Sequence, residues 1–488
     1  MKNLKAYLLL LPALLFCSCS DFLDKDPEVT IDAETVDYTD LNNMYQPVSG
    51  VYSWLRQEGT HWAVYAMTIS RDDDVDPGTN GDDWVKLNNY NYDNTLWFWN
   101  EPFSVLYFRM IKYSNKALED LAEFEKYCKT EDELKRNHSY QGEVRILRAL
   151  SYYRLVQLFG DVPILYENKQ TDLHRRSVKS VYEYALEDLD YAAKNCYRLR
   201  PNQMEHPGAV SAFTAEMLAA KIHMNMGNYA EAYKLTKDIV DNGKFDLYPD
   251  FSELFKIPGK LCDESLLEIQ TTDFGAGSGD SVGTNCWFTF QGPANNGNIS
   301  GWGWIHPNKA FRDWAAARGE TVRAETSFLY AGTTTKWGDV LRPQQGSETG
   351  CYNGKAYTPF CQLTEGRTEY GCNNNVRVFR YADVLLMYAE CALRTNQNVS
   401  DAVIKFNKVR TRANMPEVAA LTEDLILDER RMELCMEWGE RFNDLVRTGK
   451  AVQVLTAAGY NYTDDKKYMP IAKAAIDITP ALGEDVVE

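Results

Sequence analysis

The stretch GEVRILRALSYYRLVQLFGDVPIL, residues 142–165, decides the fold class of this chain. Its apolar side chains recur with a spacing of three and four residues, at Ile146, Ala149, Leu150, Tyr153 and Val156. This spacing places them on one face of an α-helix, and such a face is buried against other elements. Gly160 and Pro163 predict the end of the helix, because glycine commonly caps a helix and proline cannot continue one.

Two further segments predict pairs of packed helices. Residues 208–243, GAVSAFTAEMLAAKIHMNMGNYAEAYKLTKDIVDNG, carry apolar side chains on two helical faces that Gly227 separates. Their MGNYAEA is similar to the turn of a tetratricopeptide repeat, where small residues let paired helices pack closely. Residues 381–413, YADVLLMYAECALRTNQNVSDAVIKFNKVRTRA, give a second hairpin of this kind. The uneven spacing predicts a mostly α-helical scaffold of divergent repeats, without the regularity of a solenoid.

Two inserts interrupt the helical pattern, at residues 70–94 and 260–375. The later one is rich in Gly, Asn, Thr and Trp, the earlier one is irregular, and no sustained period is present. Loops of this length in a compact protein are usually functional or disordered, and their tryptophans argue against disorder. We therefore expect these inserts to be functional loops.

The N-terminus carries the pattern of an export signal. Lys2 and Lys5 precede an apolar run over residues 8–16, which is too short to span a bilayer. The run ends in FCSC and resembles a bacterial lipobox, in which Cys19 becomes the first mature residue and carries lipid. The predicted organisation is a signal peptide over 1–18, a lipidated tether over 19–38 and a single domain over 39–488. Ordinary cleavage beside two incidental cysteines is the alternative.

Charge and length limit the partners of the chain. Its 488 residues carry 52 Lys and Arg against 70 Asp and Glu, for a formal charge of −18. An acidic surface repels a phosphate backbone, so nucleic acid is not an expected partner. A chain of this size can bury a substantial core without disulfides or metals.

The eleven cysteines do not form the disulfide framework of a small secreted domain. Those in helix-like stretches are expected to be small buried hydrophobic residues: Cys128, Cys196, Cys391 and Cys435. Among Cys351, Cys361 and Cys372 the sequence allows one disulfide bridge and does not decide whether it forms. No C-x-x-C pair occurs and His is scarce, so a zinc site has little support.

Catalytic and metal signatures are weak. GDSVG, residues 279–283, matches the nucleophile elbow by letter, but it lacks the apolar strand before it and the helix after it. It is interpreted as a flexible loop, and no enzyme or cofactor is predicted. An EF-hand loop starting at Asp76 would place Leu87 where Glu is needed. The acidic run DDDVDPGTNGDD, residues 72–83, is therefore expected to be a solvated loop, with a structural Ca²⁺ on irregular ligands as the alternative.

Aromatic side chains in polar loops suggest a carbohydrate site. The C–H face of a sugar stacks on an aromatic ring while Asn, Asp and Arg bind its hydroxyl groups. The candidate ligand-binding residues lie in the two inserts: Trp84, Asn88, Tyr90, Tyr92, Trp287, Trp302 and Trp304. Four other tryptophans lie in stretches that read as helical and are expected to pack in the core: Trp54, Trp97, Trp99 and Trp438.

Several blocks together resemble the SusD/RagB family of Bacteroidetes surface lipoproteins. The likeness begins with the lipobox and SDFLDKDPE and continues through residues 142–165. RSVKSVYEYALEDLDYA, VRVFRYADVLLMYAECAL, FNKVRTRA, ILDERRMELCMEWGERFNDLVRTGK and YMPIAKAAIDITP then follow in the family's order.

The resemblance implies a mostly α-helical fold with a tetratricopeptide-like scaffold and ligand-binding loops. It also implies a lipid-anchored protein on the exterior of the outer membrane, which captures oligosaccharides. Such a protein delivers them to a SusC-like TonB-dependent transporter and acts as its lid. A peptide-binding lid of the same family, a surface hydrolase and a scaffold that binds only proteins are the alternatives.

Overall fold

The structure is a computed structural model and describes residues 36–56, 62–78, 82–271, 286–294, 299, 301–342, 350–363 and 373–487. The helices are α1 (Gln46–Leu55), α3 (Ala63–Ile69), α4 (Asp82–Asn88), α5 (Glu101–Val105), α6 (Lys112–Glu125), α7 (Glu131–Phe159), α8 (Val178–Asn195), α9 (Ala212–Asn225), α10 (Tyr229–Asn242), α11 (Phe251–Leu254), α12 (Cys286–Gln291), α13 (Lys309–Arg318), α14 (Val322–Ser327), α15 (Tyr381–Thr395), α16 (Val399–Arg412), α17 (Glu423–Glu433), α18 (Glu440–Arg447), α19 (Ala451–Ala457) and α20 (Lys473–Ile478). The strands are β1 (Val75–Asp76), β2 (Ser265–Ile269), β3 (His306–Pro307), β4 (Phe328–Tyr330), β5 (Cys351–Asn353) and β6 (Val376–Arg380).

Helix α7 contains residues 142–159, with the predicted apolar stripe, and its predicted end is confirmed. It begins in a capping box, in which Thr130 accepts from the Glu133 amide and the Glu133 side chain accepts from the Thr130 amide. It ends at Gly160, whose φ of 70° lies in the left-handed region that glycine tolerates. Nearly all of its second half is buried, so α7 forms the centre of the core rather than one wall of it.

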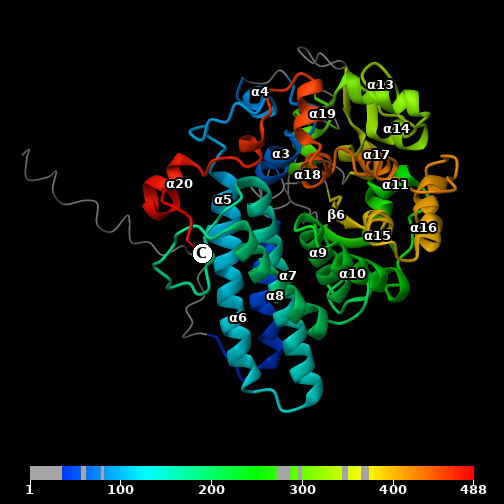
Figure 1. The fold of residues 1–488 in the computed structure, drawn as a ribbon. Helices are drawn as coiled ribbons and strands as arrows, with labels where there is room; N and C mark the ends of the chain where they lie inside the picture. Colours follow the sequence, from blue (N-terminus) through cyan, green and yellow to red (C-terminus); the bar gives the residue numbers. More distant parts are fainter. Residues whose placement is uncertain are drawn as a thin grey trace, which may run out of the picture.

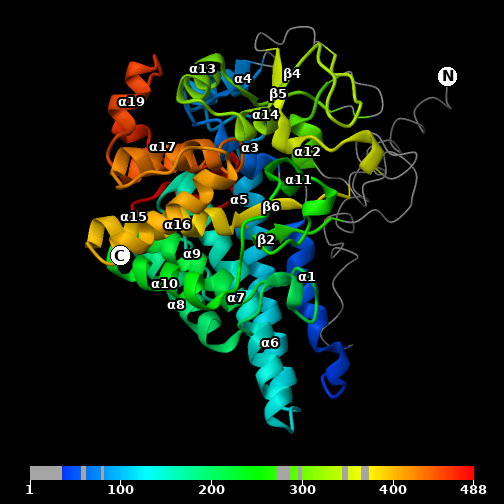
Figure 2. The ribbon, with the colours of Figure 1, turned by 90° about the vertical axis from the view of Figure 1, so that its right-hand side faces the viewer.

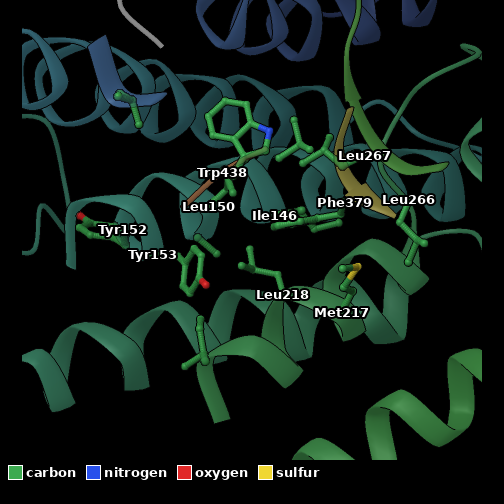
Figure 3. Packing of buried hydrophobic residues seen from close by; sticks show 14 of the residues in the cluster. Ile146, Leu150, Tyr152, Tyr153, Met217, Leu218, Leu266, Leu267, Phe379 and Trp438 are labelled. Carbon is green, nitrogen blue, oxygen red and sulfur yellow. The ribbon is translucent and has the colours of Figure 1, made fainter. Parts of the chain in front are cut away.

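Figure 3 shows how the predicted apolar stripe of α7 is covered. Ile146, Leu150 and Tyr153 lie among side chains from several other elements. These are Met217 and Leu218 of α9, Leu266 and Leu267 of β2, Phe379 of β6 and Trp438. The helix therefore joins segments that lie far apart in the sequence.

The repeat scaffold is continuous in space although it is interrupted in the sequence. Helices α6, α7, α8, α9 and α10 pack each against the next, and α10 then packs against α15, which packs against α16 (Figure 1). Both predicted hairpins are confirmed, as α9–α10 and α15–α16. A chain segment of more than a hundred residues leaves the scaffold after α10 and returns at β6.

We call the described parts of residues 243–375 the loop layer. Its elements α13 and α14 lie above the scaffold in Figure 1 and Figure 2, and Figure 2 shows α12, β4 and β5 beside them. Strand β2 pairs with β6 antiparallel, and β1 pairs with β3, with Asp76 opposite His306. The β1–β3 pair joins the earlier insert to the loop layer.

The expectation that the inserts lack helices is wrong in part. Helix α13 runs over ten residues, from an Asn308 cap that accepts from the Phe311 amide to Gly319 in the left-handed region. Helices α12 and α14 also lie in the later insert, and α4 lies in the earlier one. These helices are short, so glycine-rich neighbouring sequence hides their period.

Charged side chains are buried together where α17 meets the loop layer. The members of this buried ion network are Arg323, Lys355, Arg380, Arg410, Arg412, Glu264, Glu320, Glu429, Glu433 and Glu437. Arg380 donates to Glu264 at 2.6 Å and to Glu433 at 3.0 Å. A buried charge needs partners of opposite sign, and here the partners come from both layers. The network therefore fixes the loop layer on α17.

The cysteine expectations hold with one exception. Cys196, Cys391 and Cys435 are buried and unpaired, whereas Cys128 is only half-buried. Cys351 and Cys361 are both free thiols, and Cys372 lies outside the described residues. Along the described chain, no helix is both long and apolar enough to cross a membrane.

Candidate functional site: an aromatic surface

Aromatic side chains from both inserts and from residues on either side of the earlier insert meet at one place. We define the aromatic surface as Trp62, Trp97, Trp302 and Trp304, which are exposed or half-buried. Three buried rings support it from below: Trp84, Phe98 and Phe290. Trp84 of the earlier insert thus lies beside Trp304 of the later one, whereas Trp62 and Trp97 belong to neither insert, and ligand binding by these residues stays a prediction.

Stacking fixes the orientation of these rings. Trp62 and Trp97 are stacked, with ring centroids 5.6 Å apart and an interplanar angle of 29°. Below them Trp84 lies on Phe98 at 4.0 Å and 8°. Trp304 meets Phe290 edge-on at 4.9 Å, and Trp302 lies 5.8 Å from Trp304. Each exposed ring thus rests on another ring, which restricts its rotation before any ligand arrives.

Backbone contacts hold the segment that carries Trp302 and Trp304. The Trp302 amide donates to the Thr289 carbonyl at 2.6 Å, and the Trp304 amide donates to the Phe290 carbonyl at 2.9 Å. Gly301 lies so close to Gly292 that a side chain at Gly301 would collide with the Gly292 backbone. The glycines around these tryptophans therefore permit close backbone approach, which places both rings beside α12.

Trp97 was expected in the core, and this expectation is wrong. The side chain is 63 % exposed, because residues 94–100 form consecutive turns instead of a helix. Trp99 and Trp438 are buried as expected, and the Trp99 indole donates to the Pro470 carbonyl at 2.8 Å. Trp54 is half-buried. The alternation of LWFWN directs Trp97 outward and Trp99 inward, a signal that the helical interpretation missed.

Three of the predicted ligand-binding aromatics are buried. Trp84, Tyr90 and Trp287 are 3 %, 1 % and 2 % exposed. Trp84 supports the aromatic surface, and Trp287 packs against Tyr65 and Phe288. In this conformation none of the three offers a free ring face to a ligand, since neighbouring side chains cover them. Trp302 and Trp304 are half-buried and remain candidates.

Asn88, Tyr90 and Tyr92 lie apart from the aromatic surface and bind the backbone of other segments. Asn88 donates to the Ser70 carbonyl at 2.9 Å, and the Tyr90 hydroxyl donates to the Arg71 carbonyl. The Tyr92 hydroxyl donates to the Lys466 carbonyl at 3.0 Å. The first two bonds tie the end of α4 to residues 70–71, and the Tyr92 bond ties the chain after α4 to its C-terminal part, so the observed role of all three is structural.

The acidic run over residues 72–83 was expected to be a solvated loop, and for its first three residues, Asp72–Asp74, this is wrong. All three side chains are buried. Asp73 accepts from Arg441 at 2.8 Å, and Asp74 accepts from Arg431 at 2.9 Å. Burial, with Asp74 close by, raises the pKa of Asp72 well above its usual range. Arg441 and Arg431, which are distant in the sequence, thus form ion pairs with Asp73 and Asp74. A sequence pattern confined to the loop could not reveal these pairs.

Calcium binding stays untested. Within the described ranges, no group of three or more His, Cys, Asp or Glu side chains is arranged to hold a metal ion. Cys19 and the GDSVG motif at 279–283 lie outside the described residues. The lipidation of Cys19 therefore stays a prediction.

Two family models match separate parts of the chain. The model described as "SusD family" matches residues 329–482, and the one described as "Starch-binding associating with outer membrane" matches residues 21–222. A SusD-like protein of Bacteroides ovatus is 23 % identical, over 88 % of this chain and 80 % of its own. The starch-binding protein SusD of Bacteroides thetaiotaomicron is 24 % identical, over 63 % of this chain and 64 % of its own.

Solved structures share the fold. A surface glycan-binding protein A from B. thetaiotaomicron, in complex with laminarihexaose, matches with a TM-score of 0.75 and 24 % identity, over 90 % of this chain and 98 % of that chain. A laminarin-binding SusD-like protein matches with a TM-score of 0.76 and 22 % identity, over 89 % and 97 % of the two chains. These likenesses show the fold. The two family models, which match separate parts of the chain, and the curated relatives together show the family: the chain belongs to the SusD/RagB family.

Proposed function

We propose that this protein is a cell-surface glycan-binding protein that captures neutral oligosaccharides on the aromatic surface. The observation that carries the proposal is the surface itself, in which exposed Trp97 and three half-buried tryptophans lie over buried aromatic rings. Relatives with the same fold have been solved with laminarihexaose and with a xylogluco-oligosaccharide, which supports a glycan as ligand here.

The surface suits a saccharide chain better than a compact ligand. The Trp62–Trp97 pair and the Trp302–Trp304 pair offer two separate contact areas, which lie around the shared support of Phe290. Successive sugar rings can stack on successive aromatic rings, and each stack removes apolar area from water. Binding of this kind requires no catalytic group, and we propose that the protein binds without cleaving.

We further propose that the protein is anchored at the outer membrane through lipid on Cys19 and faces the exterior. There it would deliver its ligand to a SusC-like TonB-dependent transporter and act as its lid. A glycan that contacts both lid and transporter favours the closed state by its higher affinity for that state. The family description that refers to outer-membrane association supports the location.

A peptide ligand is the alternative within the family. Peptides are held mainly by hydrogen bonds to their backbone, so an aromatic surface would contribute less to binding them. The stacked tryptophans favour the glycan.

Calorimetric titration of the chain from residue 20 onward tests the proposal. The panel contains laminarihexaose, a xylogluco-oligosaccharide, maltoheptaose and a mixture of peptides of similar length. We expect one glycan class to bind with micromolar affinity and the peptides not to bind. Binding of peptides alone would replace the proposal with the alternative, and release of reducing ends during incubation would show hydrolysis.

A further inference from the structure

A cavity of about 740 Å³ lies between the scaffold and the C-terminal helices. The N-terminal end of α8, the C-terminal end of α9, helix α18 and residues 467–468 line it. Its volume falls within the usual range of small-molecule sites. None of its lining residues belongs to the aromatic surface. Thr68 lines the cavity and Trp62 caps the other end of α3, so this seven-residue helix separates the two places by about 10 Å.

Arg71 is an unusual residue to line a cavity, because within the described part of the chain its buried cation lacks a paired carboxylate. The residue is 2 % exposed, and no ion pair joins it to a carboxylate among the described residues, since the nearby Asp73 and Asp74 pair with Arg441 and Arg431 instead. Its Nη1 donates to the Lys467 carbonyl at a long 3.4 Å, and its Nε has no hydrogen-bond partner. Its guanidinium lies over the Phe442 ring at 4.6 Å. Burial of a cation costs free energy, and an anion is the group that best offsets that cost.

The charge of the lining is positive on an acidic protein. Its four cationic side chains and one carboxylate are Arg71, Lys179, Arg447, Lys467 and Glu183. Arg447 is already bound by Glu390 and Asp444, and Lys179 lies 3.8 Å from Glu183 at the exposed edge. Arg71 and Lys467 thus remain for an incoming anion. The formal charge of the whole chain is −18, so this positive lining is a local feature.

The remaining wall offers amide groups and aromatic faces. Asn225 donates to the Tyr182 hydroxyl at 3.3 Å and accepts from Asn443 at 3.2 Å. These bonds are long, so the amides can shift to a better partner such as a ligand hydroxyl. Phe442 and Tyr468 supply ring surface beside the two cations. Amides, aromatic rings and cations together are the groups that bind an acidic sugar.

We propose that this cavity is a second binding site, and that its ligand is a small acidic sugar. The carboxylate or sulfate group would lie against Arg71 and Lys467, and the sugar hydroxyls would meet Asn225 and Asn443. The inference does not rest on glycan binding at the aromatic surface, because it uses none of those residues.

The experiment compares two neighbouring lysines in the chain from residue 20 onward. Lys467 lines the cavity, whereas Lys466 binds the Asn461 carbonyl and is not part of the lining. Lys467→Gln and Lys466→Gln therefore remove the same charge at adjacent positions. The probes are glucuronate, glucose 6-sulfate and glucose, titrated by calorimetry at low salt. We expect the acidic probe to bind about 10-fold more weakly to Lys467→Gln, and its affinity for Lys466→Gln to change by less than about 2-fold.

The affinity of Arg71→Gln for the acidic probe gives a second test. The unfolding curve of this variant is measured as well, because the side chain is buried. If Arg71→Gln is unstable, Asn443→Ala takes its place, and we expect it to weaken the acidic sugar as well. Glucuronate binding without glucose 6-sulfate binding identifies a carboxylate ligand, and the converse identifies a sulfate. The proposal fails if neither acid binds the wild-type chain, if glucose binds equally well, or if both lysine variants lose the same affinity.

Trp97→Ala distinguishes the two sites. This variant should lose neutral oligosaccharide while it keeps the acidic sugar, because Trp97 does not line the cavity. Loss of both ligands together would mean one site and would overturn the inference. Binding of the acidic sugar by a chain that binds no neutral glycan would leave this inference standing and the proposed function refuted.

Discussion

Replacement of Glu433 by Gln should destabilise the fold by about 3 kcal/mol at neutral pH. The side chain is fully buried, and its carboxylate accepts from Arg412 at 2.6 Å and from Arg380 at 3.0 Å. Burial alone would raise its pKa, but Arg412, Arg380, Arg323 and Lys355 outweigh it and lower the pKa from 4.5 to about 2. A depression of that size corresponds to about 3 kcal/mol. Gln keeps the shape of Glu433 and removes the charge.

The loss should depend on pH in a defined direction. Because the pKa is lower in the folded state, the contribution is fully present above pH 4.5 and is lost as the pH falls towards 2. Urea unfolding of wild type and Glu433→Gln, followed by far-ultraviolet circular dichroism at several pH values, measures the difference. We expect a gap of about 3 kcal/mol at pH 7 that narrows steadily below pH 4.5.

Glu423 provides the control on the same helix. Its side chain is 46 % exposed and pairs with Arg394 at 3.1 Å, so Glu423→Gln should cost less than about 1 kcal/mol. The reasoning is refuted if the two variants are equally stable at pH 7. It is also refuted if the gap between Glu433→Gln and wild type stays constant down to pH 2.

Three smaller predictions concern the scaffold and the thiols. Burial raises the pKa of Glu143 to about 8, so its ionisation opposes folding as the pH rises from 4.5 to 8. Glu143→Gln should therefore be more stable than wild type at pH 8, and urea unfolding at pH 5 and 8 would show a flatter profile. Gly142→Ala should cost about 1–3 kcal/mol, because its new Cβ meets the Cys196 sulfur. Cys196→Ala should restore part of that loss, and a double-mutant cycle in which the two changes simply add would contradict the contact. Iodoacetamide should modify the exposed Cys361 in the native state and buried Cys351 only after unfolding, as peptide mass spectrometry would report.

The sequence predicts the scaffold well because periodicity is a local signal. The stripe of α7, its end at Gly160 and both helical hairpins follow from residues within one or two turns of each other. Helix α13 was missed, although Asn308 and Gly319 mark both of its ends. It is short, and irregular sequence flanks it, so its apolar side chains show no sustained helical period. In glycine-rich sequence, short helices are predicted better from their capping residues than from their apolar period.

The site could be predicted only in part, because it depends on contacts between distant segments. Trp302 and Trp304 were identified from their polar, glycine-rich setting. Trp97 was assigned to the core because its exposure depends on the turns after residue 93, and Trp62 gave no signal of its own. The buried state of Asp72–Asp74 depends on Arg431 and Arg441, hundreds of residues away. No pattern within the loop carries that information.

The magnitude expected at the aromatic surface follows from the exposure of Trp97. An aromatic side chain presents up to roughly 250 Å², and Trp97 has 63 % of its surface exposed. A sugar that covers about half of the exposed part removes on the order of 75 Å² from water. At about 25 cal/mol per Å² this contributes about 2 kcal/mol, or a factor of about 30 in Kd.

The most direct test of the central claim is the calorimetric Kd of the best glycan for wild type, Trp97→Ala and Tyr127→Ala. Tyr127 is also an exposed aromatic residue, but it lies just after α6, outside the aromatic surface. We predict that Trp97→Ala binds about 30-fold more weakly with an unchanged unfolding midpoint, and that Tyr127→Ala binds like wild type. An unchanged Kd for Trp97→Ala, with its fold intact, would contradict the proposal that this surface binds the glycan.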